Sequence, residues 1–104
     1  REFMYAGDLA EAIIHAVDEF DSMPLIMNIG VGKDYSINDY YLTIAKIMNY
    51  HGSFIYNLDR PVGMQQKLVS IDKQLRWGWS SKTSLEDGVN QTYKYYLNEV
   101  NYEC

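Results

Sequence analysis

The chain has 104 residues, of which 47% are hydrophobic, and its formal net charge is −5 at pH 7. This length predicts a single domain over residues 1–104, and the hydrophobic content excludes a disordered chain. The acidic balance argues against non-specific nucleic-acid binding, which needs clustered lysine and arginine, and no apolar run approaches the ~20 residues that cross a bilayer.

The first predicted elements are a strand and a helix. Residues 1–5 are expected to be extended, and a helix then begins with Asp8 or its neighbour as the capping residue. Apolar residues recur at helical spacing from Leu9 to Phe20, which predicts one buried helix face. Pro24 cannot continue a helix, so the helix is expected to end before it.

A second strand and helix follow in the sequence. Residues 25–29 form a short apolar run, typical of a buried strand that leads into a tight turn at Gly30-x-Gly32. This pattern is not a dinucleotide fingerprint, because no third glycine opens a helix and no acidic residue follows at the required spacing. Ser36 and Asp39 instead resemble a capping box, which predicts that a helix begins here.

The middle of the chain predicts short extended segments around a loop. The preceding helix is expected to end within residues 49–52, where Gly52 suits a left-handed cap. β-Branched and aromatic residues favour extended structure at 54–56 and 68–71, and proline with glycine predicts a surface loop at 59–63. A short helix is expected over 72–76.

The last predicted helix begins at Ser84, where a second capping pattern precedes a tyrosine-rich apolar stripe. Strands that alternate with three main helices predict a small α/β domain with short, partly parallel strands. His15 and His51 have no suitable partner nearby in sequence, so neither is expected to be catalytic, and no metal ligands are predicted. Cys104 is the only cysteine, which excludes an internal disulfide and fits a cytoplasmic location.

Two cations stand on the loop of this acidic chain, Arg60 and Lys67. A cationic loop on a rigid scaffold is suited to bind an anion. The alternative, which these residues alone leave open, is a solvated connection whose charges keep the chain in solution.

Five short motifs occur in a fixed order along the chain. They are Arg1-Glu2-Phe3 with Asp8-Leu9-Ala10, Asn28 to Gly32, Ser36-Ile37, Arg60-Pro61-x-Gly63 with Lys67-Leu68, and Leu75-x-Trp77-Gly78-Trp79 with Ser84 to Gly88. The series resembles the C-terminal part of the GDP-L-fucose synthases, and more loosely other nucleotide-sugar epimerases and reductases of the extended short-chain dehydrogenase family. The resemblance covers essentially the whole chain. It implies a part that lacks the Rossmann cofactor domain and forms much of the lobe that binds the nucleotide-sugar.

The resemblance implies substrate-binding roles for Arg1, Arg60 and Lys67, toward a GDP-sugar. Arg1 matches the arginine of the family's Arg-Glu-Phe segment, and Arg60 begins a loop similar to the family's Lys-Pro-Asp-Gly loop over GDP. Lys67 keeps the second cation of the family's Arg-Lys pair. Val62 and Gln66 stand where the family has charged residues, so the loop departs from the pattern at these two positions.

The family's glycine-rich cofactor loop and its catalytic Ser, Tyr-x-x-x-Lys and Cys/His groups have no counterpart in this sequence. We therefore expect no catalytic residue and no cofactor in this chain, and a full-length parent would be an NADP-dependent epimerase and reductase. The chain begins without methionine, as expected of a piece of something longer. The alternative is a free-standing domain that acts through self-association or protein association, because apolar stripes that normally face the cofactor domain would be uncovered.

Overall fold

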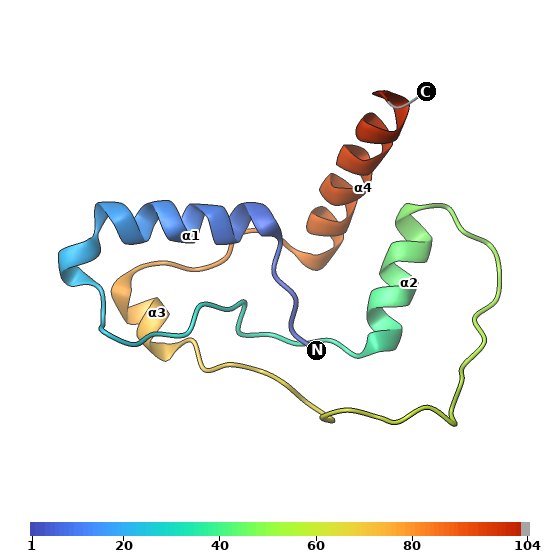
Figure 1. Ribbon diagram of the computed structural model, residues 1–104, viewed down its shortest axis with the longest axis horizontal. Helices are drawn as coiled ribbons and strands as arrows, with labels where there is room; N and C mark the ends of the chain where they lie inside the picture. The colour runs from blue at the N-terminus through green and yellow to red at the C-terminus, as the bar shows by residue number, and fades with distance from the viewer. Residues whose placement is uncertain (103–104) are drawn as a thin grey trace.

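A computed structural model describes residues 1–102 of the chain. Figure 1 shows the helices joined by long connections without regular structure. The α-helices of the described part are α1 (Ala6–Asp18), α2 (Ile37–Ile47), α3 (Asp72–Trp77) and α4 (Leu85–Tyr102), with a 3-10 helix η1 (Phe20–Ser22) after α1. Cys104 lies outside the described residues.

The predicted α/β fold with short, partly parallel strands is wrong, because residues 1–102 contain helices and no strand. The segments predicted to be strands, at 1–5, 25–29, 54–56 and 68–71, lie outside the helices but form no sheet. A strand needs a ladder of backbone hydrogen bonds with a neighbouring strand. Here several of the backbone groups that would form such a ladder are instead paired with side chains.

Gln74 on α3 shows how a side chain takes the place of a neighbouring strand. Its side chain is fully buried, with 0% relative exposure. Its Oε1 accepts a hydrogen bond from the Gly30 amide at 2.8 Å, and its Nε2 donates to the Gly30 carbonyl at 3.0 Å. The amide therefore offers one acceptor and one donor, as a peptide group of an adjacent strand does.

The two predicted capping patterns are confirmed. The Ser36 hydroxyl accepts from the Asp39 amide at 3.0 Å, and the Asp39 carboxylate accepts from the Ser36 amide at 2.9 Å. These hydrogen bonds from Ser36 hold the pKa of Asp39 below its usual value, because they favour the charged form. At the start of α4, the Ser84 hydroxyl accepts from the Asp87 amide at 3.1 Å.

One predicted helix start and one predicted helix cap are wrong. α1 begins at Ala6 with Tyr5 as its N-cap, and no side chain caps it, because the Asp8 carboxylate is turned toward a distant segment. α2 ends at Ile47, and Gly52 does not supply the left-handed residue that follows it. Asn49 takes the left-handed conformation there with φ 55°, which asparagine tolerates better than most residues.

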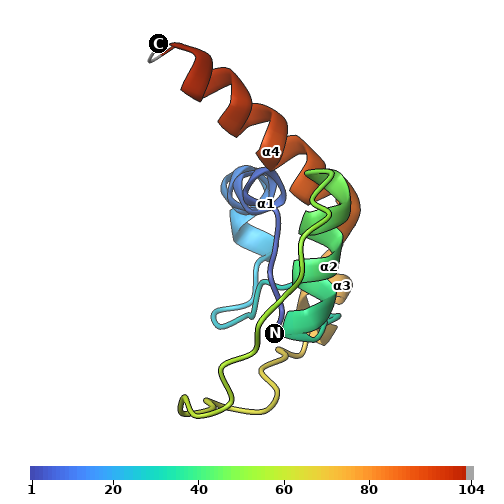
Figure 2. The same cartoon turned by 90° about the vertical axis from the view of Figure 1, so that its right-hand side faces the viewer.

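The described chain is thin and open. Its radius of gyration is 16.9 Å, and its shortest extent is 19 Å, whereas a compact chain of this length has a radius of gyration of about 13 Å. The connection between α2 and α3 runs along the outside of the molecule in both views (Figures 1 and 2). The buried apolar side chains are few, namely Ala12, Tyr40 and Trp79. No helix in residues 1–102 has the length and apolar character needed to cross a membrane.

Candidate functional site

Arg1 is held firmly by its backbone. Its amino group donates to the Tyr35 carbonyl at 2.7 Å, and the Tyr35 amide donates back to the Arg1 carbonyl at 2.9 Å. The Tyr40 hydroxyl also donates to the Arg1 carbonyl at 2.7 Å and accepts from the Phe3 amide at 3.2 Å. Burial raises the pKa of Tyr40, so its hydroxyl stays a donor at neutral pH.

The Arg1 side chain reaches the predicted binding loop. Its Nη1 donates a hydrogen bond to the Met64 carbonyl, which lies 63 positions away in sequence. A Cβ atom at Gly63 would lie 3.2 Å from the Arg1 Nη2, so a side chain at this position would displace the guanidinium slightly. The structure therefore brings the first predicted site residue to the loop that carries the other two.

Arg60 and Lys67 are exposed on this loop. Neither takes part in the two ion pairs that occur among residues 1–102, which join Lys46 to Glu86 and Lys82 to Glu11. Both cations are therefore available to an anion from solution, but the structure does not place them in contact with Arg1.

Two side-chain hydrogen bonds anchor the loop, one on each side of its exposed tip. The Tyr56 hydroxyl donates to Asn38 Oδ1 on α2 at 2.6 Å. Gln66 donates from its Nε2 to Asp34 Oδ2 at 2.8 Å. The glutamine that stands in place of the family's cation thus has a structural partner in this chain.

Glu2 is a residue that the sequence analysis missed. Its Oε1 accepts from the amides of Val31 at 2.6 Å and Gly32 at 2.8 Å, and its Oε2 accepts from the Val69 amide at 3.1 Å. A Cβ atom at Gly30 would lie 2.7 Å from the Glu2 Oε1, so this glycine makes room for the carboxylate. The sequence signal for Glu2 was its position directly after Arg1, in the first of the five motifs.

The amides of the Gly30-x-Gly32 turn are already occupied. Gln74 takes the Gly30 amide, and Glu2 takes those of Val31 and Gly32. The turn therefore does not fit the pyrophosphate of a dinucleotide cofactor.

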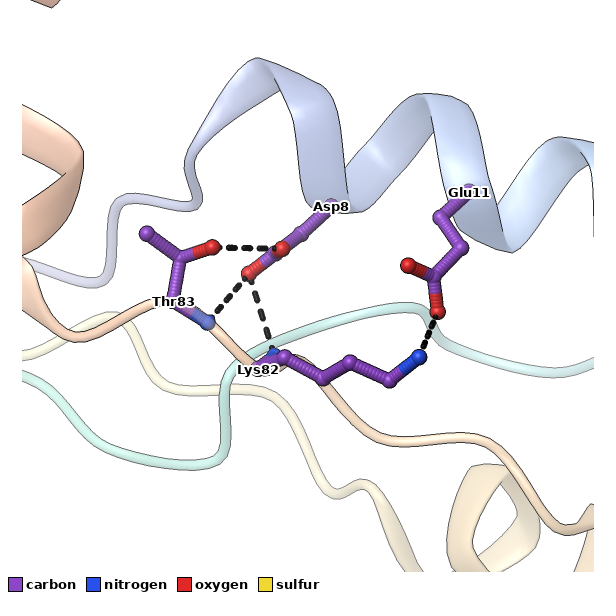
Figure 3. Close-up of polar contacts among 4 residues, drawn as sticks. All are labelled: Asp8, Glu11, Lys82 and Thr83. Atoms are coloured by element: carbon purple, nitrogen blue, oxygen red, sulfur yellow. Dashed lines mark hydrogen bonds and ion pairs between the residues drawn. The ribbon is translucent and has the colours of Figure 1, made fainter. Parts of the chain in front are cut away.

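Asp8 fixes the approach to α4 (Figure 3). It is 6% exposed, and its Oδ2 accepts from the amides of Lys82 at 3.2 Å and Thr83 at 3.0 Å, while the Thr83 hydroxyl donates to its Oδ1 at 2.7 Å. Lys82 also pairs with Glu11 at 2.5 Å, and this contact lowers the pKa of Glu11. The start of α1 and the segment before α4 are thus joined by one polar clamp.

An apolar groove of about 910 Å³ lies between α2, α4 and the N-terminal segment. Ile44 and Met48 line it from α2, and Val89 and Tyr96 line it from α4. Ile44, Met48 and Tyr96 are among the exposed large hydrophobic residues. Much of the lining of this groove is therefore uncovered apolar surface.

The two histidines lie in different surroundings. His15 packs edge-on against the Trp77 ring, with the ring centres 4.5 Å apart, and His51 is exposed. Among residues 1–102, no three His, Cys, Asp or Glu side chains are grouped so that they could hold a metal ion.

The chain is similar to curated proteins over nearly its whole length. It is 48% identical over 101 residues to a GDP-L-colitose synthase of Yersinia pseudotuberculosis, a match that covers 97% of this chain and 33% of that protein. It is 46% identical over 102 residues to a GDP-L-fucose synthase of Azorhizobium caulinodans, covering 96% of this chain and 33% of that protein. The chain therefore spans about a third of the length of these relatives. No protein-family model matches it.

Solved structures of GDP-sugar reductases match the fold. A GDP-6-OMe-4-keto-L-xylo-heptose reductase from C. jejuni has a TM-score of 0.85 and 30% identity, covering 95% of this chain and 31% of that one. A GDP-mannoheptose C4 reductase from Campylobacter jejuni, with NADP bound, has a TM-score of 0.80 and 30% identity, covering 92% of this chain and 31% of that one. The arrangement of helices and long connections therefore recurs within larger proteins.

Proposed function

This chain corresponds to the C-terminal third of the GDP-L-fucose and GDP-L-colitose synthases, and from that premise we propose that it binds the nucleotide part of a GDP-sugar. The observation that supports the proposal is the contact between the Arg1 side chain and the loop at Met64. Arg1, Arg60 and Lys67 would hold the diphosphate through charge-assisted hydrogen bonds. The whole protein would epimerise and reduce a GDP-4-keto-6-deoxy-sugar with NADPH.

The groups present in this chain indicate which functions it supplies in such a protein. The described residues offer the exposed cations Arg60 and Lys67 for an anion, but the Gly30-x-Gly32 turn does not fit the cofactor. In the Campylobacter jejuni reductase with NADP bound, this chain matches 31% of the protein. We propose that NADP and the catalytic groups belong to the other part of a longer protein, and that this part supplies substrate binding.

Replacing Lys67 with alanine tests the proposed site. We expect the affinity for GDP to fall about tenfold, because a hydrogen bond to a charged group is worth ~1.5 kcal/mol. Isothermal titration calorimetry with GDP measures this, and Lys94→Ala, an exposed lysine on α4, is the matched control. Equal affinity in wild type and Lys67→Ala, or no binding in either, would contradict the assignment of the site.

Self-association is a second candidate function, favoured by the apolar groove between α2 and α4. A second copy of the chain could cover this surface and remove its apolar side chains from water. We expect analytical ultracentrifugation to find dimers whose population rises with concentration and falls on Tyr96→Lys, since Tyr96 lines the groove. Tyr95→Lys is the control, because Tyr95 is 67% exposed and does not line the groove. A monomer at high concentration would count against this function.

A further inference from the structure

Glu2 holds together two segments that meet at the proposed site. Through its Oε1 it accepts from the amides of Val31 and Gly32, and through its Oε2 from the amide of Val69. Glu2 directly follows Arg1 in the chain, and Val69 lies two positions after Lys67. One carboxylate therefore connects the backbone next to the arginine with the end of the cationic loop.

The geometry points to Glu2 as a positioning residue, and we propose that it fixes the separation between Arg1 and the Lys67 end of the loop and thereby sets the affinity for a diphosphate. This inference rests on the proposed function. A site that is already held in its binding geometry loses less conformational freedom when the ligand arrives. The backbone of Arg1 is fixed by Tyr35 and Tyr40. The link to Val69, together with the hydrogen bond from Gln66 to Asp34, fixes the Lys67 end of the loop relative to it.

The charge of Glu2 is compatible with an anion nearby, because its oxygens are already engaged. Its three hydrogen-bond donors are backbone amides, and their dipoles offset part of the negative charge. Glu2 is therefore a partner of the protein backbone and would not touch the ligand. Its effect on binding would pass through the position of the loop.

Glu2→Gln breaks one link and keeps the other. The glutamine oxygen still accepts from Val31 and Gly32, but the new amino group faces the Val69 amide, and two donors cannot pair. We expect about a tenfold loss of GDP affinity in calorimetry, because the diphosphate must then order the loop itself. Hydrogen exchange at the Val69 amide is expected to accelerate, with or without GDP. The experiment uses the protein as its gene encodes it, with Glu99→Gln on the exposed face of α4 as the control.

The outcomes separate this inference from the proposed function. If wild type binds GDP and Glu2→Gln binds it equally well, only the role of Glu2 is overturned. Reduced affinity with unchanged exchange at Val69 also overturns that role, since the loss would not pass through the link. If wild type binds no GDP, the proposed function fails and the inference with it. Should Glu2→Gln fail to fold, Glu2→Asp provides the same test, because its shorter carboxylate cannot reach both segments.

Discussion

Replacing Gln74 with alanine is expected to lower the free energy of unfolding by about 3 kcal/mol, because two buried backbone groups lose their partner at once. The Gly30 amide and carbonyl both bond to the Gln74 side chain, at 2.8 and 3.0 Å, and this side chain is fully buried. Denaturant unfolding followed by tryptophan fluorescence measures the change, since Trp77 and Trp79 lie three and five positions after Gln74 in the chain.

A matched pair of variants separates the hydrogen bonds from simple loss of volume. Gln91→Ala on the exposed surface of α4 should leave stability within ~0.5 kcal/mol of wild type. Gln74→Glu keeps the shape but sets a carboxylate oxygen against the Gly30 carbonyl. The introduced group must be protonated to donate, so its pKa in the folded state is raised, and the loss of stability should shrink as the pH falls. A stability of Gln74→Ala close to that of wild type would contradict the role of this side chain.

The helices could be predicted from the sequence because their signals are local. Apolar spacing locates α1, and the reciprocal hydrogen bonds of Ser36 and Asp39 mark the start of α2 within four residues. The strands could not be predicted correctly, because a strand depends on a distant partner as much as on its own residues. The segment at Gly30 has strand-like composition, but its partner is a glutamine 44 positions away.

Of the candidate site, only the cations were predicted from the sequence. Arg60 and Lys67 stand out as cations on an exposed loop, and they remain predictions as binding residues. Glu2 and Asp8 were missed as structural anchors because most of their partners are backbone amides, which no sequence pattern marks. Asp8 at a helix start also fits an N-cap, so local evidence favoured the wrong role, and only the packing of α1 against residues 82–83 reveals the true one.

Replacing Asp8 with alanine is expected to lower the free energy of unfolding by roughly 3 kcal/mol, because the amides of Lys82 and Thr83 and the Thr83 hydroxyl lose a charged acceptor. Asp8→Asn should cost only about 1 kcal/mol: its oxygen still accepts from both amides, and its amino group donates to the Thr83 hydroxyl, which reverses its role. Denaturant unfolding compares the two with Asp18→Ala, an exposed aspartate at the other end of α1. If alanine and asparagine lower the free energy of unfolding equally, the charge of Asp8, and not the geometry of its hydrogen bonds, stabilises this contact. If neither lowers it, the contact does not hold α4 in place.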